Sequence, residues 1–167
     1  MIAIVDYGVG NLFSVKSSFA AIGAEAVVTS DPAVIDAADH ILLPGVGAYE
    51  DAARKLRETG MGDVVRRQAA AGKPIMGICL GMQLLFDVSY EYGEHQGLGL
   101  IPGAVTPLGV LNDAEHKVKV YLDKDFLNEP KRIGVHPNDN TATVWLNTED
   151  LMEIIQSHGT ELECVEL

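Results

Sequence analysis

The stretch Gly77-Ile78-Cys79-Leu80-Gly81 decides the fold of this chain. It follows the apolar run Lys73-Pro74-Ile75-Met76 and opens onto Met82-Gln83-Leu84-Leu85-Phe86, which predicts a strand, a sharp turn and a helix. Gly-x-Cys-x-Gly is the cysteine form of the nucleophile elbow, in which flanking glycines relieve clashes around a strained turn residue. We therefore expect the Cys79 thiol at the top of a sheet, where a helix N-terminus favours the thiolate and backbone N–H groups stabilise an oxyanion.

The residues before this stretch alternate between strand and helix patterns. Short apolar runs predict strands at 2–5, 26–28, 40–43 and 74–78. Helices are predicted from the helical spacing of Leu12, Val15, Phe19 and Ile22, from the Asp31-Pro32 start through Ala37, and over 49–58 and 62–71. Continuous apolar strands joined by helices indicate a parallel sheet that is covered on both faces.

The pattern changes near Gly97-Leu98-Gly99-Leu100-Ile101-Pro102-Gly103, beyond which strands alternate in polarity. Strands are predicted around Val118–Leu122, over Thr141–Leu146 and at Leu162–Leu167, with a helix between Asn147 and Gly159. The predicted fold class is an α/β, doubly wound, flavodoxin-like parallel sheet that is truncated, followed by a small α+β segment. The missing strands leave a sheet edge uncovered, so we expect marginal stability or self-association.

Composition limits the function classes. The chain has 167 residues and a formal charge of -12, which argues against non-specific binding to nucleic acid or an anionic membrane. Two cysteines, no signal peptide and no bilayer-length apolar run favour a reducing cytoplasm and no membrane contact. The isolated histidines suggest no metal ligand set, and we expect no cofactor.

Residues 1 to about 102 resemble the glutaminase subunit of imidazole glycerol phosphate synthase, a class I glutamine amidotransferase of histidine biosynthesis. Four motifs carry the resemblance: Asp6-Tyr7-Gly8-Val9-Gly10-Asn11, Leu43-Pro44-Gly45-Val46-Gly47, Gly77-Ile78-Cys79-Leu80-Gly81-Met82-Gln83 and Gly93-Glu94-His95-Gln96-Gly97-Leu98-Gly99.

The resemblance implies that Cys79 attacks the carboxamide of glutamine and releases ammonia. Gly45, Val46, Gly47 and Leu80 would supply the oxyanion site, and Gln83 would help to hold the substrate. Asn11 would face a cyclase subunit that receives the ammonia, in a heterodimer.

The base for this chemistry is hard to find. Amide hydrolysis through a thioester needs a histidine oriented by a carboxylate, which the family supplies in a late His-Pro-Glu run. His136-Pro137 is followed by Asn138, and it lies too close in sequence to Cys79 for the family's layout. We therefore expect hydrolysis to stall for want of a proton carrier.

Residues from about 101 to 167 resemble the back half of the prolyl-tRNA editing (aminoacyl-tRNA deacylase) family. The resemblance rests on the stretches Pro102–Asp113 and Ile133–Val144. It implies that Gly103 and Pro107 belong to the loop at the mischarged ester and that His136 lines the pocket. The family's catalytic lysine belongs to the absent front half.

The chain is interpreted as a chimera of two partial domains, 1–102 and 103–167, joined within Leu98–Val105. Three functions stay open. The first is an impaired glutaminase, the second is an aminoacyl-tRNA deacylase fragment, and the third is a non-catalytic remnant that still docks on the cyclase. Only the second function would involve tRNA.

Overall fold

The computed structural model describes residues 1–101, 106–137 and 142–166. The chain divides into two compact units, Met1–Leu100 and Ile101–Leu167. Each unit has a sheet and a set of buried apolar side chains of its own.

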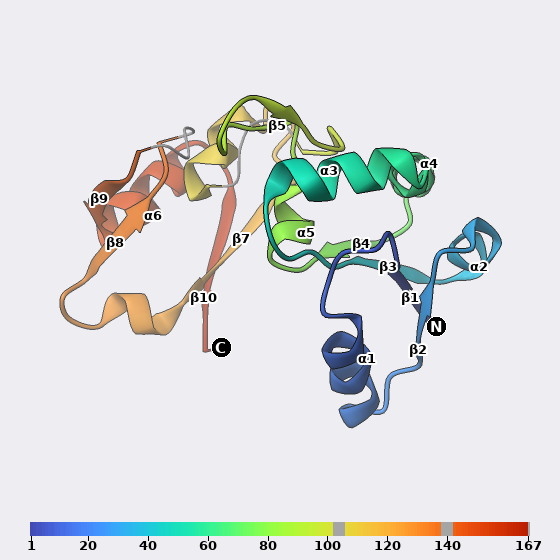
Figure 1. Ribbon diagram of the computed structural model, residues 1–167. Coiled ribbons are helices and arrows are strands. Elements are labelled where there is room, and N and C mark those ends of the chain that lie inside the picture. Colours follow the sequence, from blue (N-terminus) through green and yellow to red (C-terminus); the bar gives the residue numbers. More distant parts are fainter. Residues whose placement is uncertain (102–105, 138–141, 167) are drawn as a thin grey trace. The chain divides into compact units, whose positions relative to one another are not determined.

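The first unit is built on a parallel sheet of four strands (Figure 1). They are β1 (Ile2–Val5), β2 (Ala26–Thr29), β3 (His40–Leu43) and β4 (Ile75–Gly77), in the order β2-β1-β3-β4. The register places Ile4 of β1 beside Val28 and Leu42. Each of the four apolar runs forms a strand, which confirms the predicted α/β fold class.

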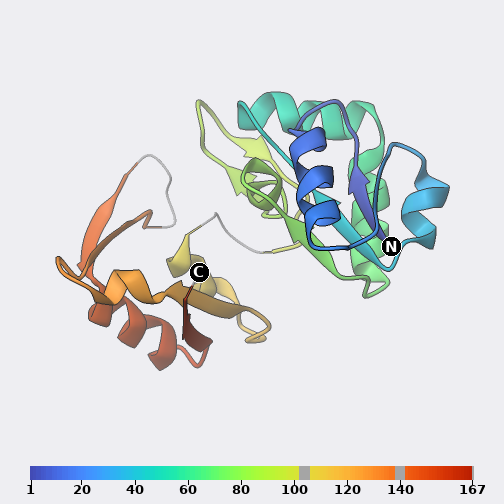
Figure 2. The ribbon, with the colours of Figure 1, turned by 90° about the horizontal axis from the view of Figure 1, so that it is seen from below.

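Helices cover both faces of this sheet (Figures 1 and 2). Helix α1 (Leu12–Ala21) lies on one face, while α3 (Tyr49–Glu58) and α4 (Met61–Ala70) lie on the other. Helices α3 and α4 both bury apolar side chains, whereas α1 buries none completely. The α1 face is therefore only thinly covered.

The start of one helix follows the predicted capping chemistry, and the end of another does not follow its apolar spacing. Helix α2 (Pro32–Ala37) has Pro32 in its first turn, and the Asp31 carboxylate accepts a hydrogen bond from the Ala33 N–H at 2.9 Å. Helix α1 ends earlier than its apolar spacing predicts. Ile22, which the spacing places in the helix, caps its C-terminus instead and is 77% exposed.

The second unit combines two pairs of strands with one α-helix. Strands β7 (Lys119–Asp123) and β10 (Glu161–Val165) are parallel, and β8 (Arg132–Val135) pairs antiparallel with β9 (Val144–Asn147). The remaining elements are the 3₁₀ helices η1 (Pro107–Asn112) and η2 (Lys124–Leu127), and α6 (Thr148–Ser157). The strand predicted at 141–146 therefore begins later, at Val144, and Thr141 lies outside the described residues.

The second unit has a compact apolar core. Val110, Val135, Leu151 and Ile155 are at most 6% exposed, and they come from η1, β8 and α6. At the surface of the β7–β10 pair, Lys119 Nζ lies 2.6 Å from Glu161 and 3.1 Å from Glu163. These carboxylates raise the pKa of Lys119, so part of the acidic face of β10 is paired with a cation.

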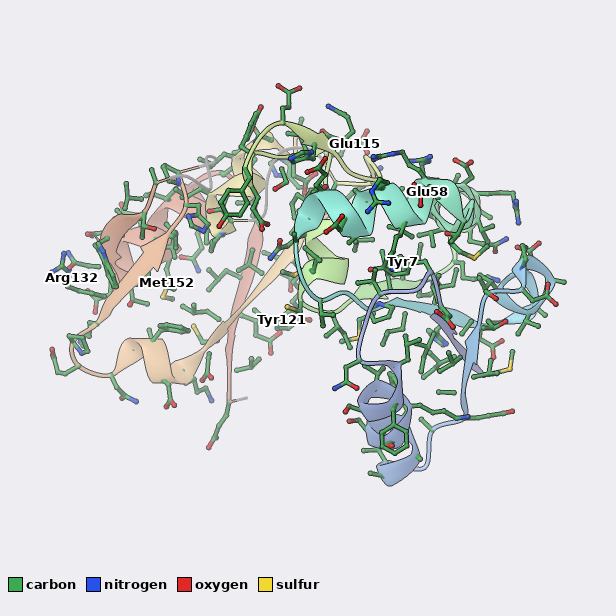
Figure 3. The ribbon with its side chains drawn as sticks, viewed as in Figure 1. Tyr7, Glu58, Glu115, Tyr121, Arg132 and Met152 are labelled. Atoms are coloured by element: carbon green, nitrogen blue, oxygen red, sulfur yellow. The ribbon has the colours of Figure 1, made fainter. Side chains whose placement is uncertain are left out.

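Two buried tyrosines of the first unit differ in their hydrogen bonding. The Tyr7 hydroxyl donates to the Pro44 carbonyl oxygen at 2.7 Å and thereby ties the loop after β1 to the loop after β3 (Figure 3). The Tyr49 hydroxyl has no hydrogen-bond partner within the described part of the chain. Burial raises the pKa of Tyr49 to about 12, and Arg57 offsets part of that rise.

The open edge of the sheet should promote self-association. Strand β4 pairs with β3 on one side only within the described residues, and Met76 in it is 58% exposed. Because lysine on an edge strand blocks edge-to-edge pairing, we expect Met76→Lys to lower the association constant, measured by sedimentation velocity, at least about tenfold. Met82→Lys makes the same change outside any strand and should leave association unchanged. Equal effects of the two variants would contradict an edge-mediated contact.

The two tyrosines should respond oppositely to loss of the hydroxyl. Tyr7→Phe leaves the Pro44 carbonyl without its donor and should lower the free energy of unfolding by about 1 kcal/mol in urea titrations. Tyr49→Phe removes an unpartnered hydroxyl and should be neutral or stabilising.

The raised pKa of Tyr49 makes the stability of the parent depend on pH. In the unfolded chain the Tyr49 hydroxyl ionises near pH 10, before it does so in the folded protein, so the free energy of unfolding should fall as pH rises from 10 to 12. Tyr49→Phe should flatten that fall, and equal losses for both variants would refute this account.

Candidate active site

The predicted elbow forms where β4 leaves the sheet. Cys79 lies between β4 and the short helix α5 (Leu80–Gln83), with φ 54° and ψ -122°. A positive φ is costly for a residue with a side chain, and such strain is typical of a nucleophile that a turn holds out of the sheet. The Cys79 side chain is exposed to solvent, as the elbow motif predicts.

Glycines allow the elbow to pack directly on the end of β3. A Cβ atom at Gly81 would collide with the Leu43 carbonyl oxygen, and one at Gly45 would collide with the Gly81 amide nitrogen. The Ile78 N–H also donates to the Leu43 carbonyl oxygen at 3.0 Å. These contacts bring the Pro44-Gly45 turn against the first residues of α5, so two of the predicted glycine-rich segments meet.

Backbone N–H groups are available beside the thiol. The first N–H groups of a helix have no acceptor within it, and the Leu80 N–H has no hydrogen-bond partner within the described residues. Val46 is 50% exposed, and Gly47 has a φ of 87°, a conformation that suits glycine. Leu80 and residues 45–47 therefore lie close enough to the thiol for their N–H groups to be candidate donors to an oxyanion formed there. Their role as its hydrogen-bond donors stays a prediction.

Helix α5 is much shorter than predicted. It ends at Gln83, Leu84 and Leu85 form a turn, and Phe86 forms a β-bridge instead of continuing the helix. The Gln83 N–H donates to the Cys79 carbonyl oxygen at 3.3 Å, which places Gln83 one turn beyond the cysteine. A helix of four residues has a small dipole, so the expected stabilisation of a thiolate by the helix is weaker than the sequence suggests.

The structure offers Cys79 no histidine partner within the described residues, since none hydrogen bonds to its sulfur. His40 begins β3, at the end of the sheet opposite to the elbow. His95 lies in β6 (His95–Gln96), which pairs with β5 (Val88–Ser89). Its Nε2 is buried and has no hydrogen-bond partner among the described residues.

Asn11 serves as the N-cap of α1. Its side-chain oxygen accepts a hydrogen bond from the Ser14 N–H at 3.3 Å. Tyr7 and Lys55 hold the same loop from the other side, because Lys55 Nζ donates to the Gly8 carbonyl oxygen at 3.1 Å. Neither contact is predictable from local sequence, because only the fold brings Pro44 and the Lys55 side chain of α3 beside this loop. The role of Asn11 at a partner surface stays a prediction.

In the second unit, two of the residues assigned to the editing reading lie close together. Pro107 begins η1, and Thr106 before it donates from Oγ1 to the His136 carbonyl oxygen at 2.5 Å. His136 Nδ1 lies 2.7 Å from the Ala142 carbonyl oxygen. Because a carbonyl oxygen only accepts, Nδ1 is the donor in this contact. Gly103 lies outside the described residues.

Among the described residues there is no group of three or more histidine, cysteine, aspartate or glutamate side chains placed to hold a metal ion. The search for helices that could cross a membrane, made over the same residues, finds none of sufficient length and apolarity.

Comparison with known proteins separates the two parts of the chain. Residues 92–154 match the family model of the aminoacyl-tRNA editing domain. Over 105 residues, the chain is 57% identical to the imidazole glycerol phosphate synthase subunit HisH of Sulfurimonas denitrificans, a match covering 63% of this chain and 51% of that protein. The chain thus spans about half the length of this relative.

One match extends over the whole chain. The HisH subunit of Geobacter metallireducens is 51% identical over 199 aligned positions, which cover 99% of this chain and 93% of that protein. A solved structure described as a glutamine amidotransferase matches with a TM-score of 0.52 and 18% identity, over 80% of this chain and 62% of that one. That likeness supports the fold, and the coverage of the Geobacter relative shows that the chain belongs to the family of imidazole glycerol phosphate synthase HisH subunits.

Proposed function

We propose that residues 1–102 form a partial glutamine amidotransferase domain in which Cys79 is the nucleophile toward glutamine. The Cys79 thiol gives its proton to solvent water as its sulfur adds to the carboxamide carbon. The carbon–nitrogen bond then breaks, the leaving nitrogen takes a proton from water and departs as ammonia, and a thioester stays on Cys79. The observation that carries the proposal is the strained backbone of Cys79, with its exposed side chain between two close-packed glycines.

The surrounding backbone supports the acylation step. The Leu80 N–H and the N–H groups of Gly45, Val46 and Gly47 are assigned to the oxygen that becomes negative when the sulfur adds. The tight contact between Gly45 and Gly81 supports this assignment, because it holds the two segments beside the same thiol. Gln83, one turn beyond Cys79, is assigned to glutamine binding.

Deacylation is the step that this chain performs poorly. Water must lose a proton as it attacks the thioester and displaces the Cys79 sulfur, and a histidine normally takes that proton. No histidine of the described residues hydrogen bonds to Cys79, so the proposal is a glutaminase that acylates without efficient turnover.

The rest of the proposal concerns partners and location. The relatives are named as subunits of imidazole glycerol phosphate synthase, which supports a heterodimer with a cyclase subunit that would receive ammonia near Asn11. Both cysteines are free, which suits a reducing cytoplasm. Residues 103–167 are assigned to a partial editing-like segment, following the match of the family model over 92–154.

Chemical labelling tests the acylation step separately from turnover. 6-Diazo-5-oxo-L-norleucine, an electrophilic glutamine analogue, should modify Cys79 in mass spectra of digested protein, and Cys79→Ala should abolish this labelling. Cys164→Ala, which changes the other free cysteine, should label as the parent does. Ammonia release from glutamine should stop at about one equivalent per chain, because the thioester persists.

Two outcomes would overturn parts of this proposal. Steady ammonia release that disappears in Cys79→Ala would show a complete catalytic apparatus and refute the stalled thioester. Absence of labelling, together with capture of the chain by the cyclase subunit, would favour a non-catalytic remnant that only docks.

A second candidate function is hydrolysis of mischarged aminoacyl-tRNA by the second unit. The match to the editing-domain model and the contact that joins Thr106 to the His136 carbonyl favour it. In this reading Gly103, Pro107 and His136 surround the carbonyl of the ester. The formal charge of -12 disfavours contact with a long RNA surface. The protein would therefore contact only the acceptor end of the tRNA, which carries the ester.

Hydrolysis of alanyl-tRNA specific for proline tests this second function. Deacylation should fall at least about tenfold in Gly103→Val, which adds bulk in the assigned loop. Cys79→Ala should not change it, because the thiol belongs to the other unit. A rate equal to the uncatalysed rate at high protein concentration would remove this candidate.

A further inference from the structure

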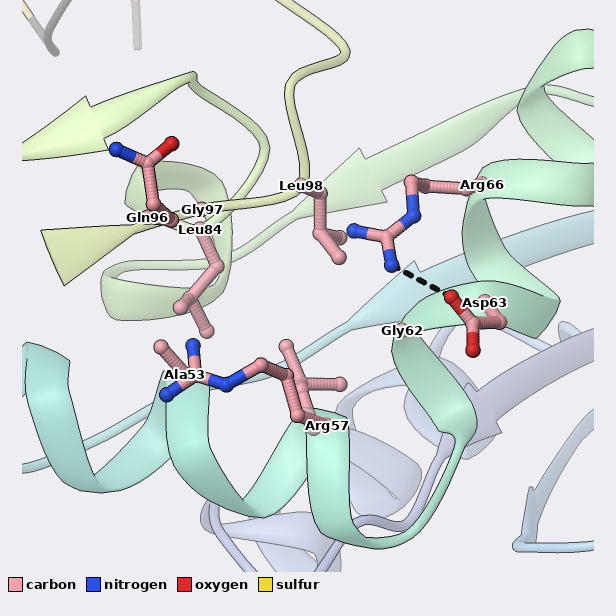
Figure 4. Close-up of a pocket in the computed structure, with 10 residues that line it drawn as sticks. Ala53, Arg57, Gly62, Asp63, Arg66, Leu84, Gln96, Gly97 and Leu98 are labelled. Atoms are coloured by element: carbon pink, nitrogen blue, oxygen red, sulfur yellow. Dashed lines mark hydrogen bonds and ion pairs between the residues drawn. The ribbon is translucent and has the colours of Figure 1, made fainter.

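A cavity of about 330 Å³ lies in the first unit, away from the elbow cysteine (Figure 4). Helices α3 and α4 form two of its walls, and the segment Gln96-Gly97-Leu98 forms a third. Cys79 does not line it. Its volume is at the lower end of the range for small-molecule sites, so it suits a compact ligand.

The floor and walls of the cavity are largely apolar. Four of the lining side chains are at most 6% exposed and come from α3, from the turn after α5 and from the segment after β6: Ala53, Leu56, Leu84 and Leu98. The neighbouring wall at Gly97 is backbone only, and a Cβ there would collide with the buried Tyr49 hydroxyl. The cavity therefore favours a ligand with a hydrocarbon body.

Two arginines extend into this space (Figure 4). Arg66 of α4 is paired with Asp63 of the same helix at 2.5 Å, so its charge is already neutralised. Arg57 of α3 forms no ion pair within the described part of the chain. The cavity thus carries one uncompensated positive charge, in a protein whose formal charge is -12.

The unpaired state of Arg57 contrasts with that of its neighbours. Arg54, also on α3, lies 2.7 Å from Asp51 and 3.3 Å from Glu58, and Glu58 points outward from the helix (Figure 3). Arg67 on α4 lies 2.8 Å from Asp36. Arg54 and Arg67, the neighbouring arginines outside the cavity, are therefore paired, whereas Arg57 has a planar set of donors free for an anion.

We propose that this cavity binds a small organic monocarboxylate with an apolar body, whose carboxylate is held by the Arg57 guanidinium and whose hydrocarbon part lies on Leu56, Leu84 and Leu98. One net positive charge matches a singly charged head group better than a dianionic phosphate monoester. The site is independent of the glutamine chemistry assigned to Cys79.

Titration of the full 167-residue chain with benzoate tests this site. Backbone amide NMR shifts should move at Gly97 and Leu98, with a dissociation constant in the millimolar range or below. Arg57→Gln should weaken benzoate at least tenfold while the amide spectrum elsewhere stays that of a folded protein. Arg54→Gln, on the same helix but outside the cavity, should bind as the parent does, and so should Cys79→Ala.

Two neutral or doubly charged probes complete the test. Benzamide, which has the same ring without the charge, should bind at least tenfold more weakly than benzoate, and phenyl phosphate should bind no more tightly than benzoate. Equal binding by Arg57→Gln and the parent, shifts centred on Cys79 and Gln83, or tighter binding of phenyl phosphate would each overturn the assignment.

Discussion

The direct backbone contact between the turn after β3 and the start of α5 is the constraint on which the first unit depends. Gly45 and Gly81 have no side chains at the point where these two segments meet, and any Cβ there would overlap main-chain atoms. This contact fixes the height and direction of the elbow, so Cys79 is carried above the sheet by backbone geometry instead of by side-chain contacts. The same approach places the glycine-rich turn beside the thiol, which links the fold directly to the chemistry that its relatives suggest.

Much of the first unit follows from local sequence signals. The strands are short apolar runs bounded by turns, and Asp31 and Pro32 set the start of α2 through a cap that needs no tertiary contact. Helix α5 was predicted too long because its end is decided elsewhere. The carbonyl oxygens of Leu84, Leu85 and Phe86 accept hydrogen bonds from the N–H groups of 98–100 at 2.8 to 3.1 Å. No local sequence pattern indicates that these carbonyl oxygens accept from a later segment of the chain instead of from a continuing helix.

The candidate site was predictable where it rests on a motif and was not where it rests on packing. The elbow and its flanking glycines were identified from five residues, whereas the cavity around Arg57 depends on α3, α4 and a segment near residue 97 meeting in space. Nothing in the spacing of Arg54, Arg57, Arg66 and Arg67 distinguishes the unpaired arginine from the others. In the second unit, the contact between Thr106 and His136 joins positions thirty residues apart, so it too becomes visible only in the fold.

The strand order of the first sheet has a consequence for synthesis on the ribosome. β1 pairs with β2, β3 lies on the other side of β1, and β4 lies beside β3, so each later strand is placed at an edge of the strands translated before it. Because folding can begin while the chain is still being synthesised, each strand after β1 can pair as it emerges, and none of these strands needs a partner from later in the chain. The turn that carries Cys79 comes last in this series. In a nascent chain, Cys79 therefore emerges only after all four strands of the sheet have been translated.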